Sequence, residues 1–238
     1  VWLNEVFDNI GYTGIRLRGG SSGNEIHHNN VEGIRLHEAG TTGNTIHDNT
    51  FNENLAQGIR LDDPAHDNIV VDNTANDNAE NGIKVASDGN TIGGSGNTAE
   101  GNTHHGIFLT TSANQNDVGK NKLTDNVLDG IHVEGTNNDI VNNHSKENHR
   151  HGISVDDASA PGNLLLLNKT SHNLVDGINF ASVTSATPLL RTTLTSTVMT
   201  GSRASVLTPA PREEGLIKIT PSTTYTRISL VARISPPS

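Results

Sequence analysis

Apolar residues in the first 180 positions alternate with polar ones over short stretches and never fall at helical spacing. Each stretch ends at Asn or Gly, residues that tolerate the positive φ of a turn. The most regular stretch reads Gly-Ile-x-apolar, and its eight copies are 19 to 25 residues apart. Their glycines are Gly14, Gly33, Gly58, Gly82, Gly106, Gly130, Gly152 and Gly177. This period predicts a solenoid in which each repeat forms one coil.

Two asparagine signatures divide each repeat further. Asn-x-(Ile, Val or Leu)-x-x-Asn recurs, and a further Asn stands four residues before seven of the glycines. Copies of the first signature run over 24–29, 44–49, 68–73, 116–121, 138–143 and 163–168. Three short strands per coil are expected, with the isoleucines stacked inward about 4.8 Å apart. The asparagines are expected to form amide ladders between coils, which is a structural role. The short first gap predicts that the first full coil lacks one segment.

Together these signatures resemble the repeat of the pectate-lyase-like superfamily over residues 6–180. The resemblance implies an all-β fold, a right-handed single-stranded parallel β-helix of about eight coils. This superfamily includes polysaccharide lyases, mannuronan C5-epimerases, glycosidases, phage tailspikes, adhesins and periplasmic copper-system proteins. The fold alone therefore does not select a function.

Composition and charge predict two units. Residues 1–180 hold all 30 Asn and all 12 His with a formal charge of −14, whereas residues 181–238 are rich in Thr, Ser and Pro and carry +4. We expect the second unit to be a C-terminal cap, because an open solenoid end exposes unpaired backbone. A homo-oligomerisation module and a linker are the alternatives.

The same features exclude several classes of protein. The acidic body argues against nucleic-acid binding, which needs a basic surface. No apolar run is long enough to span a membrane. The absence of Cys excludes a disulfide scaffold and a thiolate metal site.

A row of cations follows from the repeat. The x residue of Gly-Ile-x-apolar lies between two inward residues and is expected to face solvent. Along the chain this position holds Arg16, Arg35, Arg60, Lys84, Phe108, His132, Ser154 and Asn179. We predict that Arg35, Arg60, Lys84 and Phe108 bind an acidic polysaccharide.

Removal of the C5 proton of a uronate needs a cation on the carboxylate and a base near C5. Arg60 can neutralise the carboxylate. Lys84 can take the proton, because neighbouring cations disfavour the protonated form of a lysine. Asp62 and Asp63 could supply oxygen ligands to Ca²⁺, the one cofactor that we expect. The alternative is that Arg and Asp here form ordinary cross-strand ion pairs.

A second motif follows the third Gly-Ile strand. Mannuronan C5-epimerases share Asp-Pro-His-Asp, and residues 63–67 read Asp-Pro-Ala-His-Asp, which resembles that motif with one inserted alanine. The resemblance implies His66 as a catalytic candidate. An ordinary turn is the alternative.

Histidines and acids gather in coils five to seven, and His132 is a further catalytic candidate there. His105 and His151 both precede a repeat glycine, with Asp129 at the same position in the coil between them, so the three are expected to be vertical neighbours. Such a group suits copper or zinc binding or proton transfer. The whole group is His104, His105, Asp129, His132, Glu134, His149, His151, Asp156 and Asp157.

Three functions remain open. The first is an extracellular carbohydrate-active β-helix, a polyuronate lyase or C5-epimerase, that is secreted or on the cell surface. The second is a noncatalytic glycan-binding surface like those of adhesins and tailspikes, which the short turns and the shallow groove they predict would favour. The third is a periplasmic protein like those of copper systems.

Overall fold

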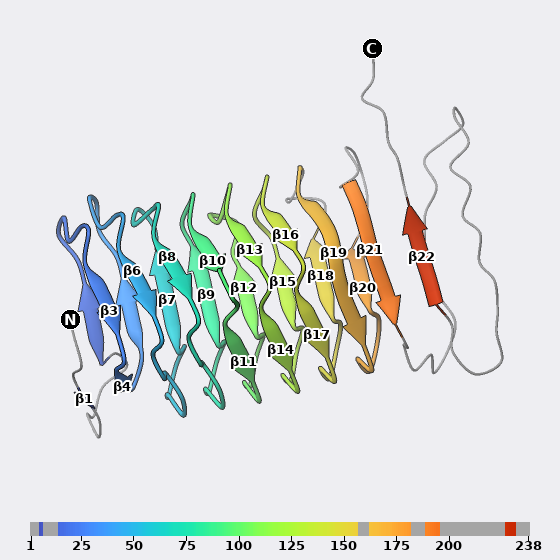
Figure 1. Ribbon diagram of the computed structural model, residues 1–238, viewed down its shortest axis with the longest axis horizontal. Coiled ribbons are helices and arrows are strands. Elements are labelled where there is room, and N and C mark those ends of the chain that lie inside the picture. Colours follow the sequence, from blue (N-terminus) through green and yellow to red (C-terminus); the bar gives the residue numbers. More distant parts are fainter. Residues whose placement is uncertain (1–4, 7–13, 157–161, 182–188, 196–226, 232–238) are drawn as a thin grey trace, which may run out of the picture.

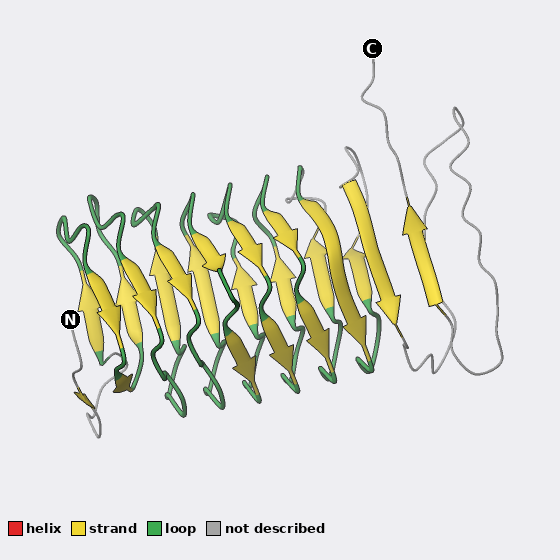
Figure 2. Cartoon of the chain, in the orientation of Figure 1, coloured by secondary structure: helices red, strands yellow, loops and turns green. Residues whose placement is uncertain are grey.

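The computed structural model describes residues 5–6, 14–156, 162–181, 189–195 and 227–231. Every regular element within these ranges is a β-strand (Figure 2), which confirms the all-β prediction. Three sheets contain these strands, and the two larger ones extend along the whole stack (Figure 1). Together they form a parallel β-solenoid.

The eight-stranded sheet contains the Gly-Ile-x-apolar strands. Its strands pair in parallel, with each isoleucine directly opposite the isoleucine of the next repeat. In spatial order they are β2 (Ile15–Leu17), β5 (Ile34–Leu36), β7 (Ile59–Asp62), β9 (Ile83–Ala86), β12 (Ile107–Leu109), β15 (Ile131–Val133), β18 (Ile153–Asp156) and β20 (Ile178–Ala181). Eight stacked strands agree with the eight repeats in the sequence.

The other strands form two further faces. One face contains β3 (Glu25–His27), β6 (Thr45–His47), β8 (Ile69–Val71), β10 (Thr91–Gly93), β13 (Asp117–Gly119) and β16 (Asp139–Val141). The other contains β11 (Thr98–Glu100), β14 (Lys122–Thr124) and β17 (His144–Lys146). The long strand β19 (Leu164–Ser171) pairs with both β16 and β17 and joins the two faces into one sheet of ten strands, which two strands of the C-terminal unit extend to twelve. A short pair, β1 (Glu5–Val6) with β4 (Asn30–Val31), lies at the N-terminal end.

Three asparagine ladders hold the coils together, as predicted. The amide oxygen of Asn121, for example, accepts the backbone N–H and the side-chain N–H of Asn97, both at 2.9 Å. The Asn97 amide also donates to the carbonyl of Val70 in the coil before, at 2.9 Å. Within the stack these contacts satisfy buried amides that would be costly to leave unpaired, whereas the amide oxygen of Asn54, the first residue of its ladder, is buried without a partner.

The sequence suggested that the asparagines at the turns have positive φ angles, but the ladder asparagines do not. The positive φ angles fall on the residue before each of them, for example Asp48 before Asn49 and Lys120 before Asn121. The corner is therefore formed by a left-handed residue followed by the inward-facing asparagine. The repeat glycine has a different role: a Cβ added at Gly106 would lie 2.7 Å from the carbonyl oxygen of Gly130. Close approach of successive coils, rather than φ, requires glycine there.

The predicted isoleucine column forms the centre of the core. Seven of the eight isoleucines are buried, and Ile178 is only partly buried because it lies near the end of the stack. The first coil is also shorter, as expected. Asn29 contacts Asn49, and Gly33, four positions later, lies against Gly58, which is nine positions after Asn49. The first coil is therefore five residues shorter between these two contacts.

The predicted C-terminal unit is described only in part. β21 (Leu189–Thr195) adds to β19 in parallel, and β22 (Arg227–Val231) then pairs with β21 in the antiparallel direction. Residues 182–188, 196–226 and 232–238 lie outside the described ranges, so the cap and its oligomeric alternative stay predictions. Among the described residues no helix is long and apolar enough to cross a membrane.

Candidate functional site

The outward positions of the eight-stranded sheet form one continuous row. Strand pairing places Arg16 opposite Arg35, Arg35 opposite Arg60 and Arg60 opposite Lys84. Phe108, His132, Ser154 and Asn179 continue the row in the same register. The order of the side chains that the sequence predicted is therefore the order in space, one rung of about 4.8 Å at a time.

Solvent exposure along this row is uneven, which corrects one expectation. Arg16 is exposed, and Arg35, Arg60 and Lys84 are half-buried. Of the later positions, Phe108 and Asn179 are also half-buried, but His132 is 8% exposed and Ser154 only 1%. Packed neighbours explain the burial of His132, whose ring lies 5.4 Å from that of Phe108 and 4.7 Å from that of His105.

Arg16, Arg35, Arg60 and Lys84, which we call the cationic stripe, line an open depression of about 470 Å³. Its other walls come from the turn before the repeat glycine, a position that was not among the predicted site residues. Gln57 and Glu80 project there and contact each other by a hydrogen bond. Gln57 directly precedes a repeat glycine, and this position in the repeat is the feature of the sequence that could have identified it as a wall residue. At the far end of the stripe the Lys84 ammonium lies 5.9 Å from the centre of the Phe108 ring.

Asp62 holds two arginines of the stripe. Its Oδ2 accepts from Nε and a terminal nitrogen of Arg35, and its Oδ1 accepts from Nε of Arg60, all at 2.7 Å. Both carboxylate oxygens thereby accept hydrogen bonds from guanidinium groups. These groups compensate the negative charge with which the carboxylate would attract Ca²⁺. The geometry gives the predicted calcium role of Asp62 no support, and a calcium site at Asp62 and Asp63 stays a prediction.

His66 lies on the turn that follows β7. Its imidazole Nδ1 is 2.7 Å from the carboxylate of Asp67, and half of its side-chain surface is exposed. Its backbone bridges to Thr42 outside the eight-stranded sheet. The structure thus gives His66 an acidic neighbour but does not place it in the row with Arg60 and Lys84.

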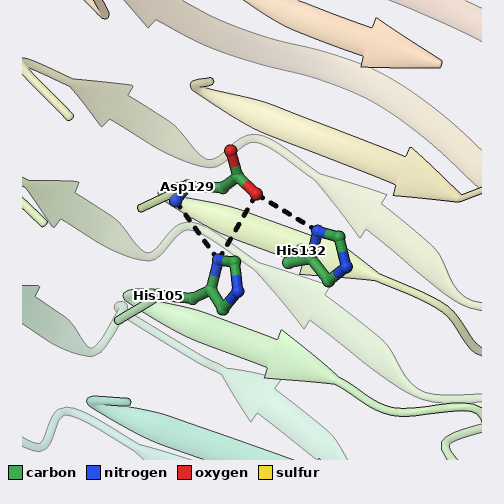
Figure 3. Close-up of side chains that lie close together, drawn as sticks. All are labelled: His105, Asp129 and His132. Atoms are coloured by element: carbon green, nitrogen blue, oxygen red, sulfur yellow. Dashed lines mark hydrogen bonds and ion pairs between the residues drawn. The ribbon is translucent and has the colours of Figure 1, made fainter. Parts of the chain in front are cut away.

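The predicted group of histidines and acids centres on Asp129, as Figure 3 shows. The carboxylate of Asp129 is completely buried. Its Oδ2 lies 3.1 Å from Nδ1 of His132 and 3.4 Å from Nδ1 of His105, and its Oδ1 accepts the backbone N–H of His151 at 3.0 Å. The expected vertical order of His105, Asp129 and His151 is therefore correct, and His132 joins them from the same strand segment as Asp129.

The contacts assign protons to the rings. A carboxylate only accepts hydrogen bonds, so Nδ1 of His132 carries the proton that it donates to Asp129. The Nδ1 of His105 accepts the backbone N–H of Asp129 at 3.2 Å, which leaves the proton of a neutral His105 on Nε2. Arg150 adds a further positive charge 3.6 Å from Asp129.

Charge and burial have opposite effects on the pKa of each of these groups. Burial alone would lower the pKa of His132, but the hydrogen bond with Asp129 and the charges of Asp129, Asp156 and Glu134 raise it above its ordinary value. Burial lowers the pKa of His105, despite the Asp129 carboxylate beside it. Burial would also raise the pKa of Asp129, but the hydrogen bonds from His132 and from the His151 backbone hold that pKa well below its usual range.

The second nitrogen of His132 faces two more carboxylates. Its Nε2 lies 3.6 Å from Oε1 of Glu134 and 3.7 Å from Oδ2 of Asp156. Asp157 lies outside the described residues. Of the other predicted members, His149 pairs with Asp125 at 2.9 Å and His151 lies 3.3 Å from Asp176. His132 is therefore the residue around which the acids gather.

A family model for the right-handed β-helix region matches residues 3–143, which is more than half of the chain. The chain belongs to the right-handed β-helix family. The fold and the family resemblance predicted from the sequence are thereby confirmed. A search of curated proteins finds no match.

Solved structures of similar fold include the periplasmic alginate epimerase AlgG. A double mutant of AlgG is 24% identical with a TM-score of 0.59, and the match covers 66% of this β-helix chain and 37% of AlgG. A single mutant is 18% identical with a TM-score of 0.56, covering 67% and 50%. AlgG without substitutions is 25% identical with a TM-score of 0.53, covering 63% and 34%. The chain thus spans a third to a half of these structures, and the likeness establishes the fold.

Proposed function

We propose that this β-helix protein is a polysaccharide-modifying enzyme outside the cytoplasm that abstracts the C5 proton of a uronate in an acidic polysaccharide. The observation that carries the proposal is the cationic stripe, four positive side chains in register on successive rungs of an otherwise acidic body. A regular array of cations suits a polymer that carries a carboxylate on each sugar. The likeness to the periplasmic alginate epimerase supports the proposal, because alginate is such a polymer.

Binding would use the stripe and Phe108 together. Arg60 contacts Asp62 through Nε. In this proposal its terminal N–H groups hold a sugar carboxylate by paired, charge-assisted hydrogen bonds. Phe108, one rung beyond Lys84, offers an apolar ring for the face of a sugar. Asp62 fixes the two arginines and leaves the stripe with a net positive charge.

Lys84 is the base in this proposal. The C5–H bond breaks, the Lys84 amine takes the proton, and the electron pair passes into the uronate carboxylate, whose charge Arg60 neutralises. Transfer of a proton from a water molecule to the opposite face of C5 then gives the epimer, and the Lys84 ammonium returns its proton to solvent. Expulsion of the sugar linked at O4 gives an unsaturated uronate instead. The same first step therefore serves an epimerase and a lyase.

Lys84 suits this role better than the two histidine candidates. His132 is nearly buried, and Asp129, Glu134 and Asp156 around it would repel a uronate. His66 lies outside the row that would bind the polymer. We therefore assign proton abstraction to Lys84 alone.

The binding part is tested with a variant that carries Arg35→Ala, Arg60→Ala and Lys84→Ala. At about 1 kcal/mol for each exposed charge contact, polyuronate affinity should fall on the order of 100-fold. Wild-type binding should weaken as salt screens the stripe. Calorimetry with mannuronan and a neutral glucan, both in a metal chelator, provides the measurement and its control. Equal mannuronan binding by the wild type and the triple variant would show that the cationic stripe does not bind the polymer.

The catalytic part is tested by Lys84→Arg beside Lys84→Ala. Arginine retains the positive charge but stays protonated, so Lys84→Arg should bind mannuronan as wild type does and show no turnover. Proton NMR reports a change of uronate configuration, and ultraviolet absorbance reports an unsaturated product. Turnover by Lys84→Arg at the wild-type rate would remove Lys84 from the chemistry.

A noncatalytic glycan-binding surface is the second candidate. The short turns between strands favour it, because a shallow groove excludes water poorly. Wild-type protein that binds mannuronan through the stripe, and neither epimerises nor cleaves any polyuronate tested, would establish this second function.

A further inference from the structure

The acidic residues around His132 suggest a ligand that the cationic stripe cannot bind. Asp129, Glu134 and Asp156 all bring a carboxylate oxygen near the imidazole of His132. Like charges held this close oppose one another unless a cation lies among them. A cation is therefore the ligand to consider.

The spacing of the outer atoms is that of a metal site. Two ligand atoms about 2.1 Å from one ion and at roughly tetrahedral angles lie about 3.4 Å apart. Nε2 of His132 is 3.6 Å from Glu134 and 3.7 Å from Asp156, too long for good hydrogen bonds but close to this separation. All three ligand atoms lie within 4.8 Å of one another.

The inner carboxylate prepares the ring for a metal. Because Nδ1 of His132 donates to the buried Asp129, the neutral ring presents the lone pair of Nε2 to Glu134 and Asp156. Metal-bound histidines usually donate their other nitrogen to a carboxylate in this way, which fixes the tautomer and the ring orientation. The arrangement in Figure 3 thus supplies the supporting contact as well as the ligand.

A second set, His105, Asp129 and His132, is less suitable. Nδ1 of His132 already donates to the carboxylate of Asp129 at 3.1 Å, and Nδ1 of His105 already accepts a backbone N–H. Its histidine rings also stack at an interplanar angle of 17°. The outer set is the better site because Glu134 and Asp156 are partly exposed, so an ion can enter from solvent.

We infer that His132 Nε2, Glu134 and Asp156 bind one divalent first-row transition metal ion of the zinc class, with Asp129 as the positioning residue behind His132. One imidazole and two carboxylates favour such an ion over Ca²⁺, which prefers oxygen alone. Three protein ligands leave a position for water or another oxygen. If the proposed function holds, a uronate carboxylate could take that position two rungs beyond Lys84, but the metal site itself does not depend on that function.

Zinc chloride titrated into chelator-treated, buffer-exchanged protein tests the site without any polysaccharide. Calorimetry should show that the wild type binds one zinc ion per chain. His132→Ala, Glu134→Gln and Asp156→Asn should each lower the zinc affinity at least 10-fold. Asp129→Asn should weaken it about 10-fold to 100-fold, the range for outer partners of a metal ligand. Cobalt(II) in place of zinc should give visible absorption bands that the same variants lose.

The matched control is His47→Ala. His27, His28 and His47 form another group of contacting histidine rings, and adventitious zinc there should respond to His47→Ala alone. Glu134 is partly exposed, so Glu134→Gln keeps the test valid if His132→Ala fails to fold. Zinc binding that is absent in the wild type, or unchanged in Glu134→Gln and Asp156→Asn, would overturn the inference. Neither result would bear on the stripe, whose binding test is made in chelator.

Discussion

The outward row of the eight-stranded sheet has two chemically opposite halves on one scaffold. From β2 to β9 it presents Arg16, Arg35, Arg60 and Lys84, of which two are held by Asp62. From β12 to β18 it presents Phe108, His132 and Ser154, with carboxylates gathered around the histidine. The backbone pairing is the same in both halves. The function of each half is therefore decided by a few outward side chains and by how deeply they are covered.

Two histidines show the contrast most clearly. Burial and the charges of Arg35 and Arg16 lower the pKa of His37 beside the cationic stripe, against the opposing effect of Glu38. The pKa of His132 is raised, because the acids around it outweigh its burial. The pKa of a histidine on this protein is thus lowered beside cations and raised beside carboxylates.

The largest expected difference between the halves concerns their central carboxylates. Asp129→Ala should lower the free energy of unfolding by about 3–5 kcal/mol, because it leaves buried donors of His132 and His151 without their acceptor. Asp62→Ala should cost about 1 kcal/mol or less, since Arg35 and Arg60 are one-third exposed and can be hydrated. Urea unfolding of both variants measures the difference. Equal losses would mean that the two carboxylates are equivalent.

The shared scaffold should respond equally in both halves. Ile59 and Ile131 occupy the same column and are both fully buried. Ile59→Ala and Ile131→Ala should each cost about 2–5 kcal/mol, because stacked neighbours above and below cannot close the cavity. Thermal and urea unfolding check this expectation. A loss confined to one half would show that the halves differ in packing as well as in surface chemistry.

The smallest effect is a pair of opposite pKa shifts, measurable by NMR titration of the imidazole protons in the presence of chelator. His37 should titrate below about 6.5 and His132 above it. Arg35→Gln should raise the pKa of His37, and Glu134→Gln should lower that of His132. Shifts of the same sign in both variants would contradict the electrostatic contrast.

The same shifts determine how pH affects stability. The pKa of His37 is lowered in the folded state, so its contribution is present above about pH 6.5 and is lost as the pH falls through the folded pKa. The pKa of His132 is raised, so its contribution is present below about pH 6.5 and is lost as the pH rises through the folded pKa. Replacing His37 should therefore change the acidic side of the stability profile, and replacing His132 the alkaline side.

The repeat pattern by itself determined most of the fold. Alternation decides which side chains point inward, and a constant period decides which residues become neighbours on successive coils. The isoleucine column, the asparagine ladders and the order from Arg16 to Asn179 all follow from these two rules. Parallel pairing in constant register transmits the linear pattern directly into space.

Depth and partner choice were decided only by the tertiary structure. Alternation placed His132 on the outer face, yet Phe108 and His105 cover it and Asp129 binds it from within the same segment. Likewise, the sequence placed Asp62 near the cations, but only the folded chain shows both of its oxygens held by Arg35 and Arg60. The periodicity of the sequence defines the face of the sheet and the coil on which a side chain lies. Burial and hydrogen bonding depend instead on the volumes and rotamers of all the neighbouring side chains.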